Sequence, residues 1–516
     1  MMKNKRFINF RPFLFVALTL IVASVLATYL FVATKAKLVV GLTLLGLSLL
    51  AFILCFILKK KALTFLVCLI AIAGCVFMNL YFRASSFDSN LKFNNKEIFI
   101  SGVICDNVST TTSGNLAIKL DNVHLLSDEF DVDINGKVVI YTSTGYFDES
   151  ELSVGRKIEA FGKLNFKSIS TNLDAYVGSF SKNEIAGGFI SHEDIILTNS
   201  YHKTFEFLAK SKVLEILRDS KAKHVEVGYA MLFGDTSFID SDIKTIFQTT
   251  GIAHLLAVSG LHVSVIVSFV GWILAKLKAS KGLRFALISA LLAVYSYICG
   301  YSVSVVRATL MAIILLYANL RGKPYDKLSV LSLVASLLLL LNPLYLFNYS
   351  FILSFVAVLS IFMLSKPIER LLDKVFYKKL SGLISLNFAV QIGLFAFSIF
   401  LFGKFEVLGI LCNLISVPIA SIAFVFLIVS TLIVSIMPFM SFLLSGYGFL
   451  VDIVIKFNYA VSRLGWTLRF GELSILILVF SLMLMFILSD YVFVSRKSKL
   501  ALAAVPASLM LLFVFI

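Results

Sequence analysis

The sequence predicts a polytopic α-helical membrane protein of about 11–13 transmembrane helices, with one all-β domain outside the membrane. Hydrophobic residues make up 59% of the 516 residues and charged residues only 15%, with a mean hydropathy of +0.94. Soluble domains carry about 25% charged residues, so composition excludes that class. The apolar residues form runs long enough to cross a bilayer, and one polar stretch, 84–200, interrupts them.

The first 83 residues predict three transmembrane helices, near 12–33, 38–58 and 62–82. This region carries ten Lys/Arg and no Asp/Glu, and seven of the ten lie before the first run or between the second and third. Basic loops stay in the cytoplasm, so the N-terminus is expected to be cytoplasmic and the chain to emerge outside after Arg83. The first run is too long for a signal peptide and is expected to be retained.

Residues 84–200 predict an extracytoplasmic β domain of about five strands, either a sandwich or an OB-like barrel. Short β-branched runs alternate with Gly, Asn, Asp and Ser turns, and nine Lys/Arg stand against sixteen Asp/Glu, a net charge of −7. A local basic and aromatic face could contact single-stranded DNA, which needs positive charge and stacking rings. Its candidate residues are Arg156, Lys157, Lys163, Lys167, Phe161 and Phe166. The acidic balance favours the alternative, a β module that binds no DNA.

The sequence after residue 200 predicts three further regions. Residues 201–250 have the periodicity of amphipathic juxtamembrane helices, 251–437 form a transmembrane core, and 438–516 add C-terminal transmembrane helices. When the spans are counted in order across the membrane, the basic runs between them all fall on the cytoplasmic side, which supports the predicted topology.

The run GIAHLLAVSGLHVSVI places His254, Ser259, Gly260 and His262 where a membrane helix usually carries Leu or Val. Polar and ionisable residues are costly at that depth, which indicates a pore or substrate path. A helix break at Ser259–Gly260 is expected, because unwound backbone is tolerated where it lines a cavity. The alternative is helix packing through small residues and histidine hydrogen bonds.

Other polar residues in the apolar runs add candidates. Arg307 is a permanent cation well inside a span, which predicts either a phosphate-lined path or an arginine that reaches back to the outer interface. Asp235, beside Gly234, could cap a helix, hold a cation or orient a histidine, and capping is the commonest of these roles. Polar groups and helix breaks in later spans are Asn342, Pro343, Gln391, Asn413 and Pro418.

Motifs of energy-coupled or metal-dependent enzymes are missing from the sequence. It has no GxxxxGK[ST] and no HExxH, and its six histidines are scattered. We therefore expect a non-enzymatic channel or transporter without a cofactor or metal.

Several phrases in order resemble the ComEC family of competence proteins. They are GYAMLFGDTS, IAHLLAVSGLHVSVI, GYSVSVVRA, LLNPLYLFNYSFILSFVAVL and AVQIGLFAFSIFLFGKFEVLGILCNLISVPIA. The resemblance points to Gly234, Asp235, His254, Ser259, Gly260, His262, Gly300, Arg307, Asn342, Pro343 and Ser354. The sequence departs from the family pattern near Val303, usually proline, and near Ile352, usually glutamine.

The resemblance implies an inner-membrane channel that passes single-stranded DNA during natural transformation. It also implies an OB-like domain before the channel, an external DNA receptor and a cytoplasmic helicase; the oligomeric state stays open. Many members carry a C-terminal metallo-β-lactamase-like domain, which is not found before Ile516, so we expect a channel without its own nuclease. Two alternatives remain: a transporter of another polyanion or lipid-linked glycan, and a membrane hydrolase using Asp235, His254 and His262.

Overall fold

The computed structural model describes most of the chain as two compact units. Its described residues are 12–33, 61–105, 108–111, 113–147, 154–167, 183–201, 205–469, 475–491 and 501–506, with a few isolated positions. One unit contains residues 13–211 and 332–348, and the other contains 212–331 and 349–516. The predicted second span, 38–58, lies outside the described residues.

The β domain is a nine-stranded sheet, not the five strands expected, because short strands flank the long ones. The strands are β1 (Glu97–Ile104), β2 (Ser109–Thr110), β3 (Leu116–Ser127), β4 (Phe130–Ile134), β5 (Lys137–Thr142), β6 (Arg156–Lys163), β7 (Asn165–Phe166), β8 (Glu184–Phe189) and β9 (Ile195–Tyr201).

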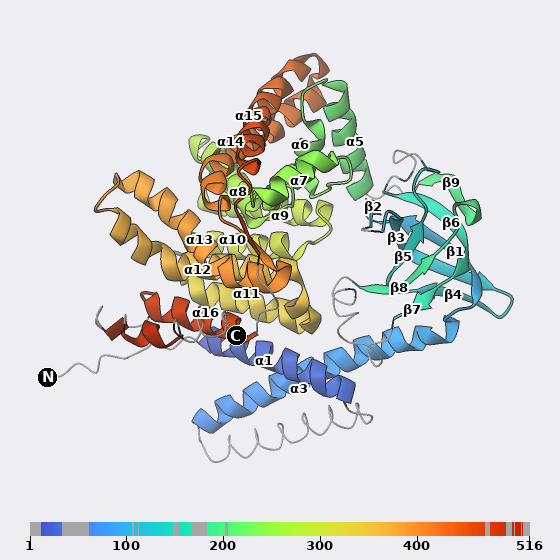
Figure 1. Ribbon diagram of the computed structural model, residues 1–516, viewed down its shortest axis with the longest axis horizontal. Helices are drawn as coiled ribbons and strands as arrows, with labels where there is room; N and C mark the ends of the chain where they lie inside the picture. The colour runs from blue at the N-terminus through green and yellow to red at the C-terminus, as the bar shows by residue number, and fades with distance from the viewer. Residues whose placement is uncertain are drawn as a thin grey trace. The chain divides into compact units, whose positions relative to one another are not determined.

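The sheet curls around one apolar interior (Figure 1). Its order is β7-β8-β5-β3-β1-β6-β9, with β2 and β4 also paired to β3. Alternate residues of β1 face inward, and Ile98, Ile100 and Ile104 are at most 1% exposed. The β5–β8 pair is parallel, and β7, which follows β6 directly, pairs with β8. These pairings suit a closed Greek-key barrel; the OB-like assignment stays a prediction.

The same unit contains the N-terminal helices α1 (Pro12–Ala33) and α3 (Lys61–Asp88) and the end of α11 (Lys327–Leu341). Two side chains of α3 hold that end. Asn79 Nδ2 donates to the Leu340 carbonyl at 3.0 Å, and Arg83 donates to the Leu341 carbonyl at 2.8 Å. Helix ends leave carbonyls without intrahelical partners, so these bonds satisfy the terminus of α11.

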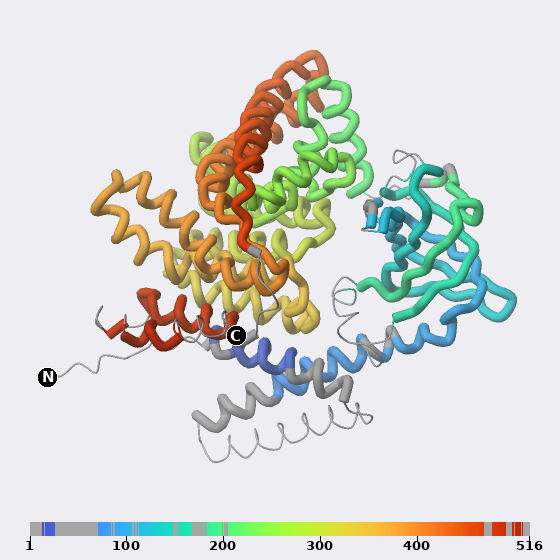
Figure 2. Tube along the Cα trace, in the orientation of Figure 1, coloured from blue at the N-terminus to red at the C-terminus, as the bar shows by residue number. Residues whose placement is uncertain are grey.

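The second unit is helical. Its elements are α5 (Phe205–Asp219, shared with the first unit), α6 (Val225–Phe233), α7 (Ser241–Thr249), η3 (Ala253–Leu255), α8 (Gly260–Lys276), α9 (Lys281–Ile298), α10 (Val303–Arg321), α12 (Tyr349–Leu372), α13 (Lys378–Phe402), α14 (Gly409–Ile436), α15 (Leu444–Ser462) and α16 (Ile475–Leu488). The Cα trace shows α12 and α13 as a helical hairpin (Figure 2).

Six described helices are long and apolar enough to cross a membrane, and five shorter apolar helices accompany them. The chain is therefore a multi-pass membrane protein with a separate sheet domain, as the sequence predicts. One expectation was wrong: α14 continues through Pro418 without interruption. Pro418 removes one backbone donor but leaves the other hydrogen bonds of this 28-residue helix in place.

The buried core of the helical unit joins α6, α8, α10, α14 and α15. Among its members, the large side chains of Phe247, Phe424 and Tyr447 are at most 2% exposed. This core fixes the start of α8, where the sequence places its candidate site.

Candidate functional site

The helix break predicted near Ser259–Gly260 is present. After α7 ends at Thr249, the chain turns at Gly251 (φ +69°), forms the short η3, and becomes α-helical again at Gly260. Only glycine adopts such a positive φ without steric cost, which explains Gly251 at the turn. The first nine residues of the GIAHLLAVSG segment therefore lie outside any α-helix.

Ser259 and His262 start α8 through a reciprocal cap. The Ser259 hydroxyl accepts the Leu261 N–H at 3.2 Å, and the Ser259 N–H donates to His262 Nδ1 at 3.1 Å. This is a capping box in which histidine replaces the usual Glu or Gln. Because Nδ1 accepts, neutral His262 carries its hydrogen on Nε2. The ring is 2% exposed and meets Phe424 edge-on at 4.5 Å.

The two histidines of the motif do not share one environment. His254 is exposed on η3, whereas His262 is buried. Within the part of the chain that the structure describes, no group of three or more His, Cys, Asp or Glu side chains could hold a metal ion.

Arg307 lies at the start of α8, although it belongs to α10. Its Nε donates to the Ser354 hydroxyl of α12 at 2.8 Å, and its guanidinium lies 5.7 Å from the Phe355 ring centre. One terminal nitrogen approaches Gly260 so closely that a Cβ there would come within 2.7 Å. A side chain at position 260 would therefore have to displace the Arg307 guanidinium.

Arg307 is 5% exposed, so the alternative in which it reaches the outer interface is wrong. It is the only buried lysine or arginine among the described residues, and it forms no ion pair with a carboxylate of that part of the chain. A buried charge without a partner is costly. The structure thus brings together three of the predicted residues, Gly260, Arg307 and Ser354.

A second group of predicted residues meets at the start of α14. Asn413 is buried and donates through Nδ2 to the Gly409 carbonyl at 2.7 Å. Two groups surround Gly409. A Cβ added to this glycine would lie 3.5 Å from the Thr250 carbonyl oxygen and 3.7 Å from the side-chain amide nitrogen of half-buried Gln391. The loop after α7, α13 and α14 therefore approach one another at Gly409, a residue that no sequence signal identified.

Other predicted residues make local turns. Gly234 ends α6 with φ +79°, the left-handed cap expected of glycine. Asp235 does not cap a helix: it accepts from the Ser237 N–H and hydroxyl, while Asp240 caps α7. Gly300 (φ +61°) turns the chain between α9 and α10.

Asn342 and Pro343 belong to the other unit. The Asn342 side chain accepts from the Leu344 N–H at 3.2 Å and begins η4 (Pro343–Phe347), with Pro343 in its first turn. Proline suits that position because the N–H it lacks would have no intrahelical partner. Their geometry is that of a helix start, and their membership of a substrate path stays a prediction.

The basic face of the β domain is largely neutralised by its own acids. Lys157 pairs with Glu159 at 3.5 Å and Lys163 with Glu97 at 3.3 Å. Lys167 is mostly buried and lies 3.9 Å from Glu184.

The remaining members of the face differ in exposure. Arg156 donates to the Thr198 carbonyl at 3.0 Å. Phe166 is 6% exposed and packs in the core against Phe93, so it is not available for stacking on a base. Phe161 is 37% exposed beside Phe99, 56% exposed, with ring centres 4.9 Å apart. Of the two predicted phenylalanines, Phe161 therefore keeps an exposed ring and Phe166 does not, and the neighbouring Phe99 was not predicted.

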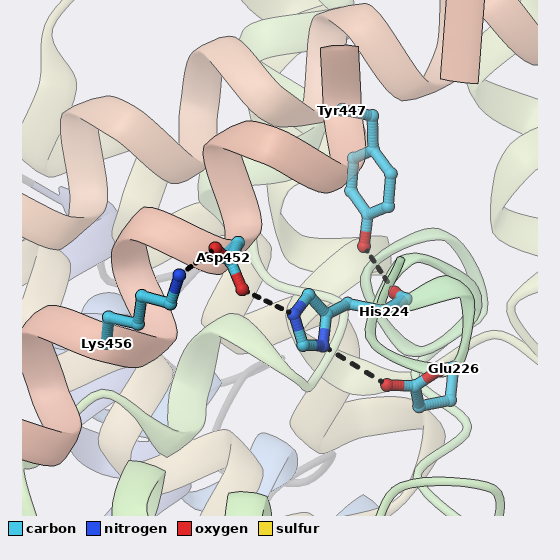
Figure 3. Close-up of polar contacts among 5 residues, drawn as sticks. All are labelled: His224, Glu226, Tyr447, Asp452 and Lys456. Atoms are coloured by element: carbon cyan, nitrogen blue, oxygen red, sulfur yellow. Dashed lines mark hydrogen bonds and ion pairs between the residues drawn. The ribbon is translucent and has the colours of Figure 1, made fainter. Parts of the chain in front are cut away.

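Sequence reasoning missed a polar cluster centred on His224, shown in Figure 3. His224 Nε2 lies 3.2 Å from Asp452 Oδ1 and Nδ1 lies 3.6 Å from Glu226 Oε1. Asp452 also binds Lys456, four residues further along α15, at 2.7 Å. The sequence signal was the His-Val-Glu at the start of α6, but nothing local indicated a partner on α15.

Comparison with known proteins assigns the family. A family model described as "Competence protein" matches residues 231–492, slightly more than half of the chain. This chain belongs to the ComEC family of competence proteins. The matched region contains α8, Arg307 and the start of α14, so the site described above lies within the part that defines the family.

Two curated relatives have named roles. The chain is 28% identical over 189 residues to ComE operon protein 3 of Bacillus subtilis, covering 37% of this chain and 24% of the relative. It is 30% identical over 217 residues to Recombination protein 2 of Haemophilus influenzae, covering 39% and 27%.

A third relative is an uncharacterized protein of Aquifex aeolicus, 28% identical over 235 residues, covering 43% of this chain and 54% of that protein. This ComEC-family chain thus spans about a quarter of the two named relatives and about half of the third. No solved structure matches it.

Proposed function

We propose that this ComEC-family protein passes single-stranded DNA through the cytoplasmic membrane during natural transformation. Membership of the competence family and the multi-pass helical core support this function. In this proposal the N-terminus is cytoplasmic, the β domain faces outward, an external receptor delivers the DNA, and a cytoplasmic helicase takes it up. The protein itself acts as a channel and not as an enzyme.

The observation that carries the proposal is the buried charge of Arg307. A guanidinium stays protonated, and at 5% exposure it has little water to compensate its charge. Its neighbours Ser354 and Phe355 are neutral, and the partly positive N-terminus of α8 adjoins it at Gly260. Each of these features favours an anion, and the anion of a DNA strand is the phosphodiester, which arginine binds readily.

Sequence-independent transport requires contacts to phosphates and not to base edges, because phosphate contacts carry no sequence information. A single strand also needs surfaces tolerant of any base, and aromatic faces provide them. In the β domain, Phe99 and Phe161 supply such a surface and are our candidates for first contact with the strand.

The test follows DNA labelled on one strand into cells with and without this gene, scoring surface label, cytosolic label and transformants separately. We expect normal surface binding and no cytosolic label without the gene. Restoring the gene should restore cytosolic entry, whereas a variant with Arg307→Met should not. Unchanged entry in the deletion strain would contradict the proposal and favour transport of another polyanion or lipid-linked glycan, which the same buried charge could serve.

A further inference from the structure

The ring of His224 lies between two carboxylates at the junction of α6 and α15 (Figure 3). The Asp452 contact is 3.2 Å and the Glu226 contact 3.6 Å, and the three side chains are only 19–25% exposed. A neutral imidazole has one N–H and can donate to one acid only, whereas the protonated ring donates to both. The geometry therefore fits the charged ring best.

Other contacts hold the same junction and do not depend on this proton. The Tyr447 hydroxyl donates to the His224 carbonyl at 2.9 Å, and Tyr447 is fully buried. Gly448 packs on the backbone of Lys223, where a Cβ would come within 2.9 Å of the carbonyl oxygen. His224 itself has φ +58°, a conformation that costs energy for a residue other than glycine. The start of α6 is thus docked on α15 in a strained conformation that the ionic contacts help to retain.

The charged groups around the ring balance only when it is protonated. Glu226 belongs to α6, and Asp452 and Lys456 belong to α15. Lys223, the residue before His224, attracts the Asp452 carboxylate electrostatically. Asp240, at the start of α7, repels the Glu226 carboxylate. Three acids then face two lysines, and the imidazolium supplies the third positive charge. The contact with Glu226 raises the pKa of His224 most, burial opposes it, and the hydrogen bond with Asp452 raises it further.

The other end of α6 reaches the candidate site. Met231, on its last turns, lies around the same narrow apolar gap as His262 and Phe424. The adjacent Leu232 carbonyl accepts the hydroxyl of Tyr295 on α9 at 3.0 Å. His224 precedes α6 directly, and the nine residues of this helix make fewer than three turns. A shift of α6 at the His224 end would therefore also move Met231 beside His262.

We propose that His224 is a proton-binding site whose occupancy holds α6 against α15 and thereby sets the packing beside His262. Because the folded-state pKa of His224 is raised, the ionic contacts are fully present below its ordinary pKa and are lost as pH rises through the raised value. The site goes beyond the proposed function, and only its effect on DNA entry rests on that function.

The test is hydrogen exchange of the α6 amides in the purified full chain in lipid nanodiscs without DNA, corrected for the chemical exchange rate at each pH. We expect protection of α6 to fall as pH rises through the raised His224 pKa. His224→Gln should remove this pH dependence. His124→Gln is the matched control, because His124 also lies between two acids, Asp131 at 3.1 Å and Asp133 at 2.9 Å, in the β domain.

Two results would overturn the inference: wild-type protection that does not change with pH, or the same pH dependence in His224→Gln. If His224→Gln does not fold, Glu226→Gln provides the test, because removing one acid should lower the pH at which protection is lost. An unchanged midpoint in Glu226→Gln would also overturn it. Since no DNA is present, a failed proton site and a failed DNA channel give different results.

Discussion

Replacing Arg307 with methionine should remove DNA entry while leaving the stability of the fold nearly unchanged. Methionine keeps a long unbranched stem and removes the charge. The substitution loses one charge-assisted bond to Ser354, about 1.5–3 kcal/mol, and a cation–π contact with Phe355, about 0.5–2 kcal/mol. It also removes the desolvation cost of a buried ion, several kcal/mol in proteins. The terms nearly cancel, so we expect a net change between a loss of about 1 kcal/mol and a modest gain.

The assay has two parts on the same variant. Thermal unfolding of the purified protein in nanodiscs measures stability, and cytosolic label per folded molecule measures DNA entry. Entry should fall at least about tenfold if the contact is worth about 1.4 kcal/mol along the path. Arg321→Met is the matched control on the same helix, because Arg321 is exposed and lies 5.7 Å from the Tyr317 ring. It should leave entry unchanged.

The reasoning is refuted if Arg307→Met unfolds far below the wild-type temperature and entry falls only in proportion to the folded protein. Arg307 would then be a packing residue that its neighbours stabilise more than the structure indicates. Normal stability with normal entry would refute the phosphate contact itself.

Three further predictions test the surrounding structure. Ser259→Ala should lower stability by about 1 kcal/mol in thermal unfolding, since it removes the cap of α8; no loss would show that the cap is unimportant. Gly393→Ala should destabilise the protein by about 1–3 kcal/mol, since its Cβ would overlap the Ser360 side chain. Gly282→Ala, where a Cβ meets nothing within 4 Å, should be tolerated. Phe161→Ala in the full chain should weaken binding of single-stranded oligonucleotides by about 1–3 kcal/mol if bases stack there; unchanged affinity would remove the β domain from the DNA path.

The features that the sequence predicted well are local ones. Alternation of residue types located the β domain, and long apolar runs located the membrane helices, because both patterns follow from the element's own geometry. The start of α8 was predictable for the same reason, since Ser259 and Gly260 favour a helix boundary whatever lies beside them. The end of α6 at Gly234 was predictable in the same way, because glycine favours a helix end.

The features that the sequence could not predict depend on distant partners. Whether Lys163 offers its charge to DNA is decided by the register that places Glu97 across from it. Whether both ring nitrogens of His224 meet a carboxylate is decided by Asp452, which is 228 residues away in the chain. Burial alone argues against an Arg307 that reaches the outer interface, because the same residue type suits an interface or a path; the phosphate path stays a prediction.

The polar residues of the helical core therefore differ in how strongly their contacts support a place in the proposed substrate path. Asn413 bonds within its own helix, Ser259 and His262 bond each other, and their chemistry is that of helix starts and packing. Arg307 differs because hydrogen bonds to neutral groups do not cancel its charge. A single fixed cation also suits conduction better than a cluster would, because an anion must bind well enough to enter and weakly enough to leave. A strand of phosphates moving past Arg307 would meet one such contact per nucleotide, which permits movement in steps without holding the strand.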